Sequence, residues 1–147
     1  MVATLRSSEL FEGVDDDALE KIASFCTALN FGEGGLLMTD QSDVRGGHDL
    51  YLILDGAYDV IAHHPTNPEE LMTLGNLDSE VVGEIAWLFG SSRTATVSSR
   101  GELRAVRIDG DSFMAYLEEN PAIGFLVMRR LLRGLSTKLI ESNYYLF

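Results

Sequence analysis

The sequence predicts a mainly β, α+β fold in which helices flank a sandwich, barrel or roll of short strands. Strand-like apolar runs follow one another between residues 26 and 108, and clusters of Gly, Asn, Asp or Pro separate most of them. Helical patterns lie on both sides of this region. Many short strands joined by turns are typical of a sheet that closes or folds over on itself.

Two short helices are expected ahead of the strands. Residues 7–11 have the pattern of a helical turn that Gly13 ends. Asp15, Asp16 and Asp17 then start a second helix, with acidic residues where the helix dipole favours them. Its apolar face consists of Leu19, Ile22, Ala23 and Cys26. The three aspartates could form a metal site, but capping of the helix is the favoured interpretation.

The strand region contains seven expected strands, at residues 26–31, 36–39, 50–54, 58–62, 71–74, 94–98 and 102–108. Gly56 favours a tight turn between two of them, because glycine adopts backbone conformations that other residues avoid. His63 and His64 open a polar hairpin tip and hint at a metal. Adjacent residues on a strand point to opposite faces, however, and His48 lies in a separate loop, so a metal role is disfavoured.

Two helices are expected after the strands. Residues 109–111 supply a turn and an N-cap for a helix that runs to about Glu119. Pro121 then opens the last helix at the position that proline prefers. That helix carries an apolar stripe made of Met128, Leu131, Leu132, Leu135 and Leu139. The first half of the stripe is expected to pack on the core.

The stretch from residue 83 to residue 97 predicts the binding site. A short helix that begins near Gly83 would turn unpaired backbone N–H groups toward one point, which suits a phosphate oxygen. Arg93 could add a bidentate contact to the same anion. Glu84 suits a neighbouring hydroxyl, and an anion beside a hydroxyl describes a sugar phosphate. The alternative is an ordinary strand–turn–helix with a surface salt bridge between Glu84 and Arg93.

This stretch resembles the phosphate-binding cassette of cyclic nucleotide-binding domains, in which Phe-Gly-Glu precedes an apolar helical turn and Pro-Arg-Thr/Ala-Ala. Residues 51–56 (Tyr-Leu-Ile-Leu-Asp-Gly) are similar to the Leu-Tyr-x-Ile-x-x-Gly of that family, and Asp49 resembles the acid that closes the preceding loop. The resemblance implies an antiparallel β-roll, or jelly roll, with N-terminal helices, a short phosphate-binding helix and C-terminal helices.

The resemblance also implies roles for single residues. Glu84 would accept the ribose 2′-hydroxyl, and Arg93 with the helix amides would hold the cyclic phosphate. In relatives the last helix swings over the purine, so its second half, around Leu135 and Leu139, is a candidate lid or dimer surface. The expected ligand-binding residues are Val82, Gly83, Glu84, Ile85, Ala86, Arg93, Thr94, Ala95, Leu135 and Leu139.

Length and composition indicate one domain over residues 1–147, with a helical lead-in at 1–25, a β-roll at 26–108 that contains the cassette at 83–97, and helices at 109–147. Cys26 is the sole cysteine, which excludes an internal disulfide and favours a reducing, cytoplasmic setting. No apolar run approaches the roughly 18 residues of a membrane span, and the N-terminus lacks a signal-peptide pattern. We therefore expect no insertion into a membrane.

The formal net charge of −12 repels nucleic acid and anionic lipid. Many bacterial relatives carry a DNA-reading helix-turn-helix after the sensor, and the 147 residues leave no room for one. No nucleic-acid partner is expected.

The favoured function is that of a regulatory, non-enzymatic module that binds a cyclic nucleotide without metal or cofactor. Cyclic AMP is favoured over cyclic GMP, although in this family a hydroxyl at the place of Thr94 can reach the amino group of a syn guanine. Nucleotide binding would reposition the last helix. A protein effector or a second subunit, with a homodimer formed through that helix as one possibility, would detect the change.

Two alternatives stay open at this level. The first is a cyclic nucleotide-binding-like domain that binds protein without nucleotide, which the departures Ser79, Val82 and Ser92 from the family pattern favour. Ser42 is a further departure from that pattern. The second is a small cupin-like enzyme, disfavoured because a His-x-His with a spaced Glu is not present. The sequence leaves open the effector, the oligomeric state, whether the chain is complete, and the role of residues 144–147.

Overall fold

The computed structural model describes residues 1–39, 48–63, 66, 67, 69, 71–75, 80–90, 93 and 95–143. The N-terminal elements are α1 (Val2–Arg6), the 3-10 helix η1 (Glu9–Phe11) and α2 (Asp16–Ala23). The strands are β1 (Cys26–Phe31), β2 (Leu36–Met38), β3 (Leu50–His63), β4 (Leu71–Gly75), β5 (Val81–Val82) and β6 (Thr96–Ile108). Helix α3 (Glu84–Phe89) lies between β5 and β6, and α4 (Gly110–Glu119) and α5 (Pro121–Asn143) end the described chain.

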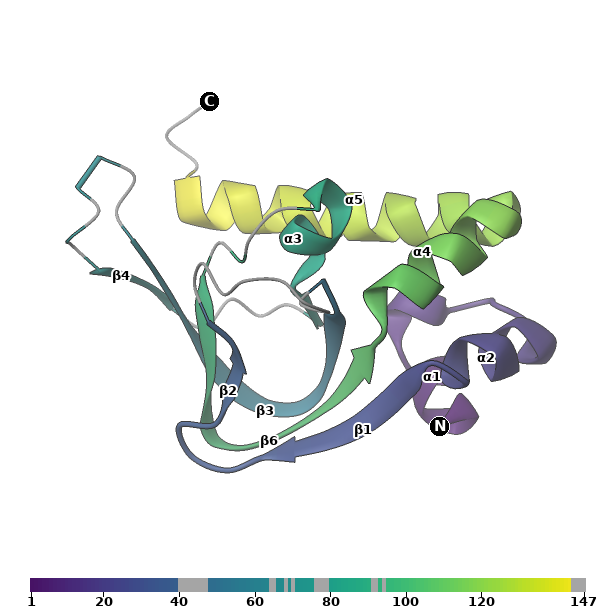
Figure 1. Ribbon diagram of the computed structural model, residues 1–147, viewed down its shortest axis with the longest axis horizontal. Coiled ribbons are helices and arrows are strands. Elements are labelled where there is room, and N and C mark those ends of the chain that lie inside the picture. Colours follow the sequence, from purple (N-terminus) through teal and green to yellow (C-terminus); the bar gives the residue numbers. More distant parts are fainter. Residues whose placement is uncertain are drawn as a thin grey trace.

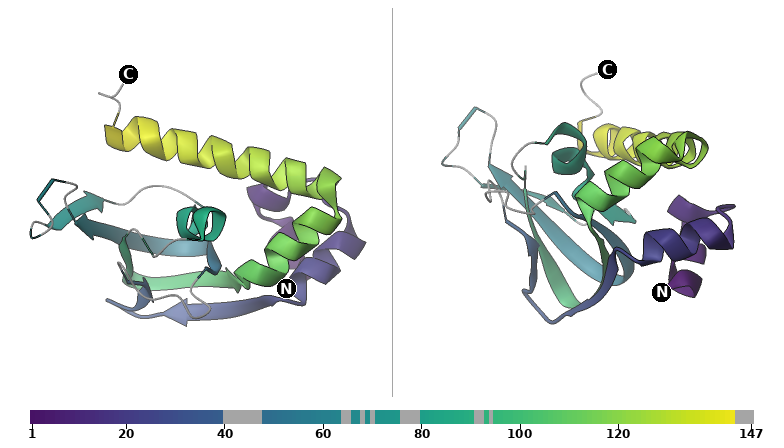
Figure 2. Two further views of the ribbon diagram at one scale, coloured as in Figure 1. Left: turned by 45° about the horizontal axis from the view of Figure 1, so that its top comes forward. Right: turned by 45° about the vertical axis from the view of Figure 1, so that its right-hand side comes forward.

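The strands among the described residues form one antiparallel sheet in the order β1-β6-β3-β4, with β2 paired to β6 and β5 paired to β3. The sheet curves into an open roll, and α5 lies along the side toward which the roll opens (Figures 1 and 2). Helix α3 sits between the sheet and α5, while α1 and α2 pack at the end of the sheet away from β4 (Figure 1). The expected mainly β fold with flanking helices is confirmed.

The expected tight turn at Gly56 is wrong, because β3 runs without interruption from Leu50 to His63. Gly56 instead lies at a bulge where β3 shifts its register against β6. Its φ is 107°, and a Cβ atom there would lie 2.4 Å from the carbonyl oxygen of Glu102. Glycine is therefore required by the close approach of two strands that bend together. The two strands expected between residues 94 and 108 likewise form the single strand β6.

The N-terminal region was predicted in part. Asp15 caps α2 by accepting a hydrogen bond from the Ala18 N–H at 2.8 Å, so the capping interpretation of the three aspartates is confirmed. Helix α1 was not expected, and its N-cap, Met1, makes no side-chain hydrogen bond. The helix is instead held by burial of Leu5, which is fully buried in the core. Tertiary packing, rather than a capping signal, stabilises so short a helix.

Two apolar clusters hold the fold together. The first lies between the helices and one end of the sheet, and it includes Leu19, Leu50, Trp87, Phe113 and Val127. The second fills the roll itself and consists of Leu37, Tyr58, Val60, Val82, Val97, Leu103 and Ala105. Because alternate residues of β3 face opposite sides of the sheet, this one strand contributes to both clusters. Helix α3 packs on the first cluster through Trp87 and Leu88, and Val82, just ahead of the helix, belongs to the second.

The C-terminal helices begin as expected, at Gly110 and Pro121. The apolar stripe expected on α5 is wrong in one respect, because Leu131 is buried whereas Leu132 is 60% exposed. Only residues at helical spacing on one side of α5, such as Val127 and Leu131, reach the core. Leu132 points elsewhere, since adjacent residues on a helix differ in direction by about 100°.

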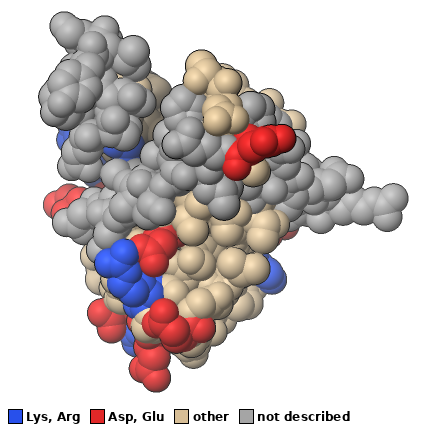
Figure 3. Space-filling model, turned by 90° about the vertical axis from the view of Figure 1, so that its left-hand side faces the viewer, with Lys and Arg blue, Asp and Glu red and all other residues tan. Residues whose placement is uncertain are grey.

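The charges of the described residues are spread over the surface. On the face shown in Figure 3, the basic side chains are few, and acidic side chains lie close to them. Within the described part of the chain, no helix is long and apolar enough to cross a bilayer.

We expect Asp109→Ala to destabilise the protein by about 1 kcal/mol at neutral pH, the usual cost of removing an N-cap. Asp109 caps α4 by accepting a hydrogen bond from the Ser112 N–H at 3.0 Å. Hydrogen bonds from Ser112 also lower the pKa of the Asp109 carboxyl. A lowered pKa stabilises the folded state above the unfolded pKa of about 3.9, and this stabilisation is lost as the pH falls through the folded value.

The measurement is denaturant unfolding of the wild type and of Asp109→Ala between pH 7 and pH 2. The difference in the free energy of unfolding should shrink below about pH 4. Asp111→Ala is the control, because Asp111 lies in the first turn of the same helix and is not its N-cap. A difference that stays constant throughout this range would contradict the capping role of the carboxylate.

Candidate ligand-binding site

The site is built around Gly83, the residue that precedes α3. Its φ of 91° lies in the left-handed region, which glycine adopts without strain. A Cβ atom at this position would lie 2.8 Å from Nη1 of Arg93 and 2.9 Å from the carbonyl oxygen of Asp49. Both the backbone conformation and the surrounding space therefore require glycine here.

The Arg93 side chain is buried, with 4% of the residue exposed, and two backbone carbonyls hold its guanidinium. Nη1 donates a hydrogen bond to the Gly83 oxygen at 3.1 Å, and Nη2 donates to the Asp49 oxygen at 2.8 Å. Burial lowers the pKa of Arg93, and the negative groups of its surroundings, including Asp49 and Glu84, counteract this effect. A guanidinium carries five N–H donors, so these two carbonyls do not saturate it.

Asp49 and Trp87 join the site to α4. One carboxylate oxygen of Asp49 accepts a hydrogen bond from the Gly110 N–H at 2.9 Å. The indole N–H of Trp87 donates to the Gly110 carbonyl oxygen at 2.8 Å, and its ring stacks on Phe113 with centroids 5.5 Å apart. Trp87 therefore links α3 directly to the start of α4.

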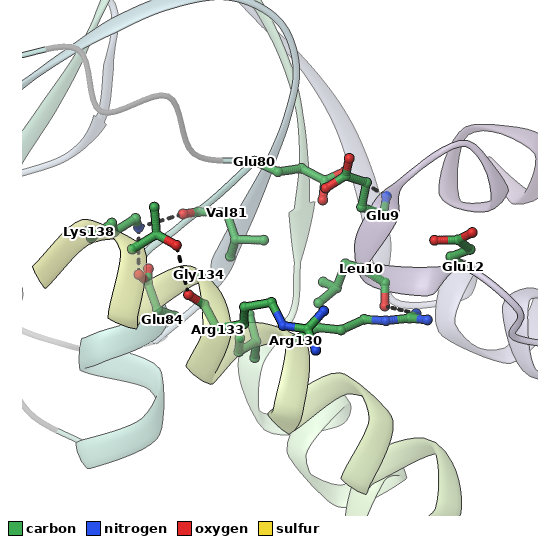
Figure 4. A pocket seen from close by; sticks show the side chains of 12 residues that line it. Glu9, Leu10, Glu12, Glu80, Val81, Glu84, Arg130, Arg133, Gly134 and Lys138 are labelled. Atoms are coloured by element: carbon green, nitrogen blue, oxygen red, sulfur yellow. Dashed lines mark hydrogen bonds and ion pairs between the residues drawn. The ribbon is translucent and has the colours of Figure 1, made fainter. Parts of the chain in front are cut away.

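Glu84, the first residue of α3, is 3% exposed. Its Oε1 accepts a hydrogen bond at 2.6 Å from Nζ of Lys138, which also donates to the Val81 carbonyl oxygen at 2.8 Å (Figure 4). The alternative suggested by the sequence, a surface salt bridge between Glu84 and Arg93, is wrong. Both side chains are buried, and Glu84 pairs with Lys138. Arg93 is held by carbonyls, and α5 brings a different cation to the buried carboxylate.

A pocket of about 500 Å³ opens beside these residues, within the range typical of small-molecule sites. Nine of the ten residues expected from the sequence line it: Val82, Gly83, Glu84, Ile85, Ala86, Arg93, Ala95, Leu135 and Leu139. Thr94, the tenth, lies outside the described residues, as do Ser42, Ser79, Ser92 and His64. The pocket thus combines two buried, oppositely charged side chains with a largely apolar wall.

The sequence reasoning missed six lining residues: Met38, Tyr58, Val60, Phe89, Val97 and Lys138. Tyr58 and Val60 alternate along an expected strand, but alternation does not say which face becomes the inside of a roll. Lys138 follows Leu135 by three residues and therefore shares its helical face. That spacing was a usable signal for placing Lys138 in the site.

A second cavity, of about 330 Å³, lies between η1, β5 and α5. Its lining is rich in charge, with Glu9, Glu12 and Glu80 together with Arg130 and Arg133. Glu84 and Lys138 line both cavities. The ion pair between them is therefore part of the wall that the two cavities share.

Comparison with known proteins concerns the sequence and the fold of the chain. No protein-family model matches the chain. It is 25% identical over 139 residues to a CRP-like cAMP-activated global transcriptional regulator of Mycobacterium tuberculosis, an alignment that covers 95% of this chain and 58% of the regulator. The chain thus spans somewhat more than half the length of this relative.

Two solved structures have a fold similar to that of this chain. The crystal structure of a cyclic nucleotide-binding domain from Methylobacillus flagellatus matches with a TM-score of 0.76 and 22% identity, over 96% of this chain and 77% of that one. The regulatory subunit of a cAMP-independent protein kinase A from Trypanosoma brucei matches with a TM-score of 0.72 and 20% identity, over 98% and 48% of the respective chains. The chain has the β-roll fold of the cyclic nucleotide-binding domains, as its cassette predicts.

We expect Gly83→Ala to destabilise the protein by at least about 1 kcal/mol more than Gly90→Ala, because only the former forces a new Cβ against a backbone oxygen. Gly90 is a matched control: its φ is 63°, and a Cβ atom there would meet nothing within 4 Å. Chemical denaturation of both variants measures the difference. Equal losses would show that the packing around Gly83 is less restrictive than described.

Proposed function

We propose that this domain is a regulatory module that binds a cyclic nucleotide without covalent chemistry. One observation carries the proposal: Glu84 and Arg93, both almost completely buried, line the same 500 Å³ pocket. Burying charged groups is costly unless they are paired or serve a ligand. A cation for a cyclic phosphate and a carboxylate for the adjacent ribose hydroxyl fit the two halves of one ligand.

The apolar lining suits the rest of the nucleotide. Leu135 and Leu139 of α5 line the pocket together with Val82 and Ala86, so a purine held by its sugar phosphate would lie against the last helix. Cyclic AMP is favoured as the ligand, because the name of the mycobacterial relative describes activation by cAMP. We propose that nucleotide binding shifts α5 and that a partner protein in the cytoplasm detects the shift.

A second function has a specific observation in its favour. The polar groups of the site already have partners within the protein, with Glu84 bonded to Lys138 and Arg93 to two carbonyls. A structural neighbour of similar fold is described as cAMP-independent. The alternative is therefore a domain that uses this fold to bind protein and takes up no nucleotide.

We expect Arg93→Ala to weaken cyclic AMP binding by about 10- to 100-fold, because a charge-assisted hydrogen-bonded contact contributes roughly 1.5–3 kcal/mol. Isothermal titration calorimetry with cyclic AMP and cyclic GMP measures this loss. Arg100→Ala is the control, since Arg100 pairs with Asp59 at the surface and does not line the pocket. Failure of the wild type to bind either nucleotide at millimolar concentration would favour the protein-binding alternative.

The same titration tests the role of Glu84. Glu84→Ala should weaken binding of cyclic AMP while leaving the affinity for 2′-deoxy cyclic AMP nearly unchanged, because the lost partner is the 2′-hydroxyl. Equal weakening of both ligands would assign the carboxylate a different role.

The exposed face of α5 offers a surface for a second copy of the chain. Phe125, Leu132 and Leu139 recur at seven-residue intervals and are 69%, 60% and 41% exposed. In a coiled coil, apolar residues recur at two positions of each seven-residue repeat, and this stripe supplies one of the two. We propose a homodimer through this stripe. Leu139 also lines the ligand pocket, so the dimer surface and the site would share a residue.

We expect Leu132→Glu to raise the dissociation constant of the dimer by at least about tenfold, because it places a charge in the apolar contact. Analytical ultracentrifugation over a range of concentrations measures the dissociation constant. Leu36→Glu makes the same change at a leucine of β2 that is 55% exposed and should leave it unchanged. Matching effects of the two variants, or a wild type that stays monomeric, would contradict the proposed dimer.

A further inference from the structure

The cation that holds Glu84 comes from α5, the helix that the proposed function expects to move. Nζ of Lys138 lies 2.6 Å from Oε1 of Glu84, and the two side chains are 18% and 4% exposed. The interaction joins positions that are 54 residues apart in the chain. Figure 4 shows both side chains at one end of the charged cavity, with α5 on one side of them and the start of α3 on the other.

The two halves of α5 are held in different ways. In the first half, Val127 and Leu131 are buried in the core, and Arg130 donates a hydrogen bond to the Leu10 carbonyl oxygen at 3.0 Å. None of the described side chains from residue 132 to residue 139 is buried. There, Lys138 bonds to Val81 and Glu84 and so connects the helix to both β5 and α3.

The Lys138 ammonium bonds to one oxygen, Oε1, of the carboxylate that the proposed function assigns to the ribose. A hydrogen bond between two charged groups is stronger than one from a neutral hydroxyl, so a ribose 2′-hydroxyl that approaches Oε1 must compete with Lys138 for it. The cavity on the other side of the pair offers Lys138 another position, because three carboxylates line it, those of Glu9, Glu12 and Glu80. Arg130 and Arg133 also line this cavity, and their positive charges offset part of the negative charge of the three carboxylates.

We propose that Lys138 is a latch and a specificity-determining residue of this site, an inference that rests on the proposed function. Its ion pair with Glu84 fastens the second half of α5, and a ligand whose hydroxyl takes the Oε1 atom must displace it. Nucleotides with a 2′-hydroxyl at this oxygen therefore break the ion pair and leave this part of α5 in contact with the ligand through Leu135 and Leu139, whereas nucleotides without one bind and leave the pair intact. The latch thereby links recognition of the sugar to the position of the helix.

Lys138→Gln tests the latch. Lys21→Gln is the control, because this variant makes the same change at an exposed position of α2. Calorimetric titration with cyclic AMP and 2′-deoxy cyclic AMP should show about a tenfold gain in cyclic AMP affinity for Lys138→Gln, since the carboxylate no longer has a charged competitor. The affinity for the deoxy analogue should stay within about twofold. Weakened binding of both ligands would make Lys138 a direct ligand contact, and unchanged affinities would make the pair purely structural; either result overturns the latch.

A second readout needs no nucleotide. Amide hydrogen exchange over residues 132–143 of α5 should be about tenfold faster in Lys138→Gln than in Lys21→Gln, because the fastening of the helix is lost. Glu84→Gln should have a similar effect, and the double variant should add little to either single change. Unchanged exchange would overturn the proposal even if nucleotide binds.

The two readouts separate failure of the latch from failure of the proposed function. If the wild type binds no nucleotide while Lys138→Gln accelerates exchange, the nucleotide assignment and the competition both fall, and only the mechanical fastening of α5 stands. If the wild type binds cyclic AMP while neither readout responds to Lys138→Gln, the proposed function stands and the latch is wrong.

Discussion

The buried guanidinium of Arg93 is the interaction on which the arrangement of the site depends. Its hydrogen bonds to the Gly83 and Asp49 carbonyls tie the start of α3 to the residue that precedes β3. Only glycine fits at position 83, because any Cβ would meet both the guanidinium and one of these carbonyls. A charge with this little contact to water must have oxygen atoms as partners, and the backbone carbonyls of Gly83 and Asp49 supply them.

Asp49 extends this arrangement to the helices. Its carbonyl holds Arg93, and its carboxylate accepts a hydrogen bond from the first residue of α4. Trp87 completes the connection with its hydrogen bond to Gly110 and its stacking on Phe113. Two side chains, those of Asp49 and Trp87, therefore connect the cassette to the start of α4.

Helix α5 combines a half packed on the core with a half that polar contacts hold. Apolar packing of Val127 and Leu131 secures the first half, and the ion pair of Lys138 secures the second. An ion pair is a suitable link for a helix that the proposed function expects to move, since a ligand can exchange with one partner, whereas buried apolar surface has no such substitute. The same half of α5 carries Leu135 and Leu139 into the pocket, so any change in its position alters the wall of the site.

Local signals in the sequence predicted the mainly β fold class and the start of the cassette helix, and the resemblance to cyclic nucleotide-binding domains supplied the nine expected residues that line the pocket. Gly83 beside Glu84 marks the start of a helix, Asp109 marks another, and Pro121 a third. These signals act over a few residues, so they can be read without knowing what packs against them.

Only the tertiary structure decided how the charges are paired and how the strands bend. Gly56 has the sequence pattern of a turn, yet it lies in a continuous strand because the approach of Glu102, distant in sequence, requires a residue without a side chain. Glu84 pairs with Lys138 and not with Arg93, because the curvature of the roll brings α5 over the cassette. Pairing of buried charges depends on which elements meet in space, and the spacing of residues along the chain does not contain that information.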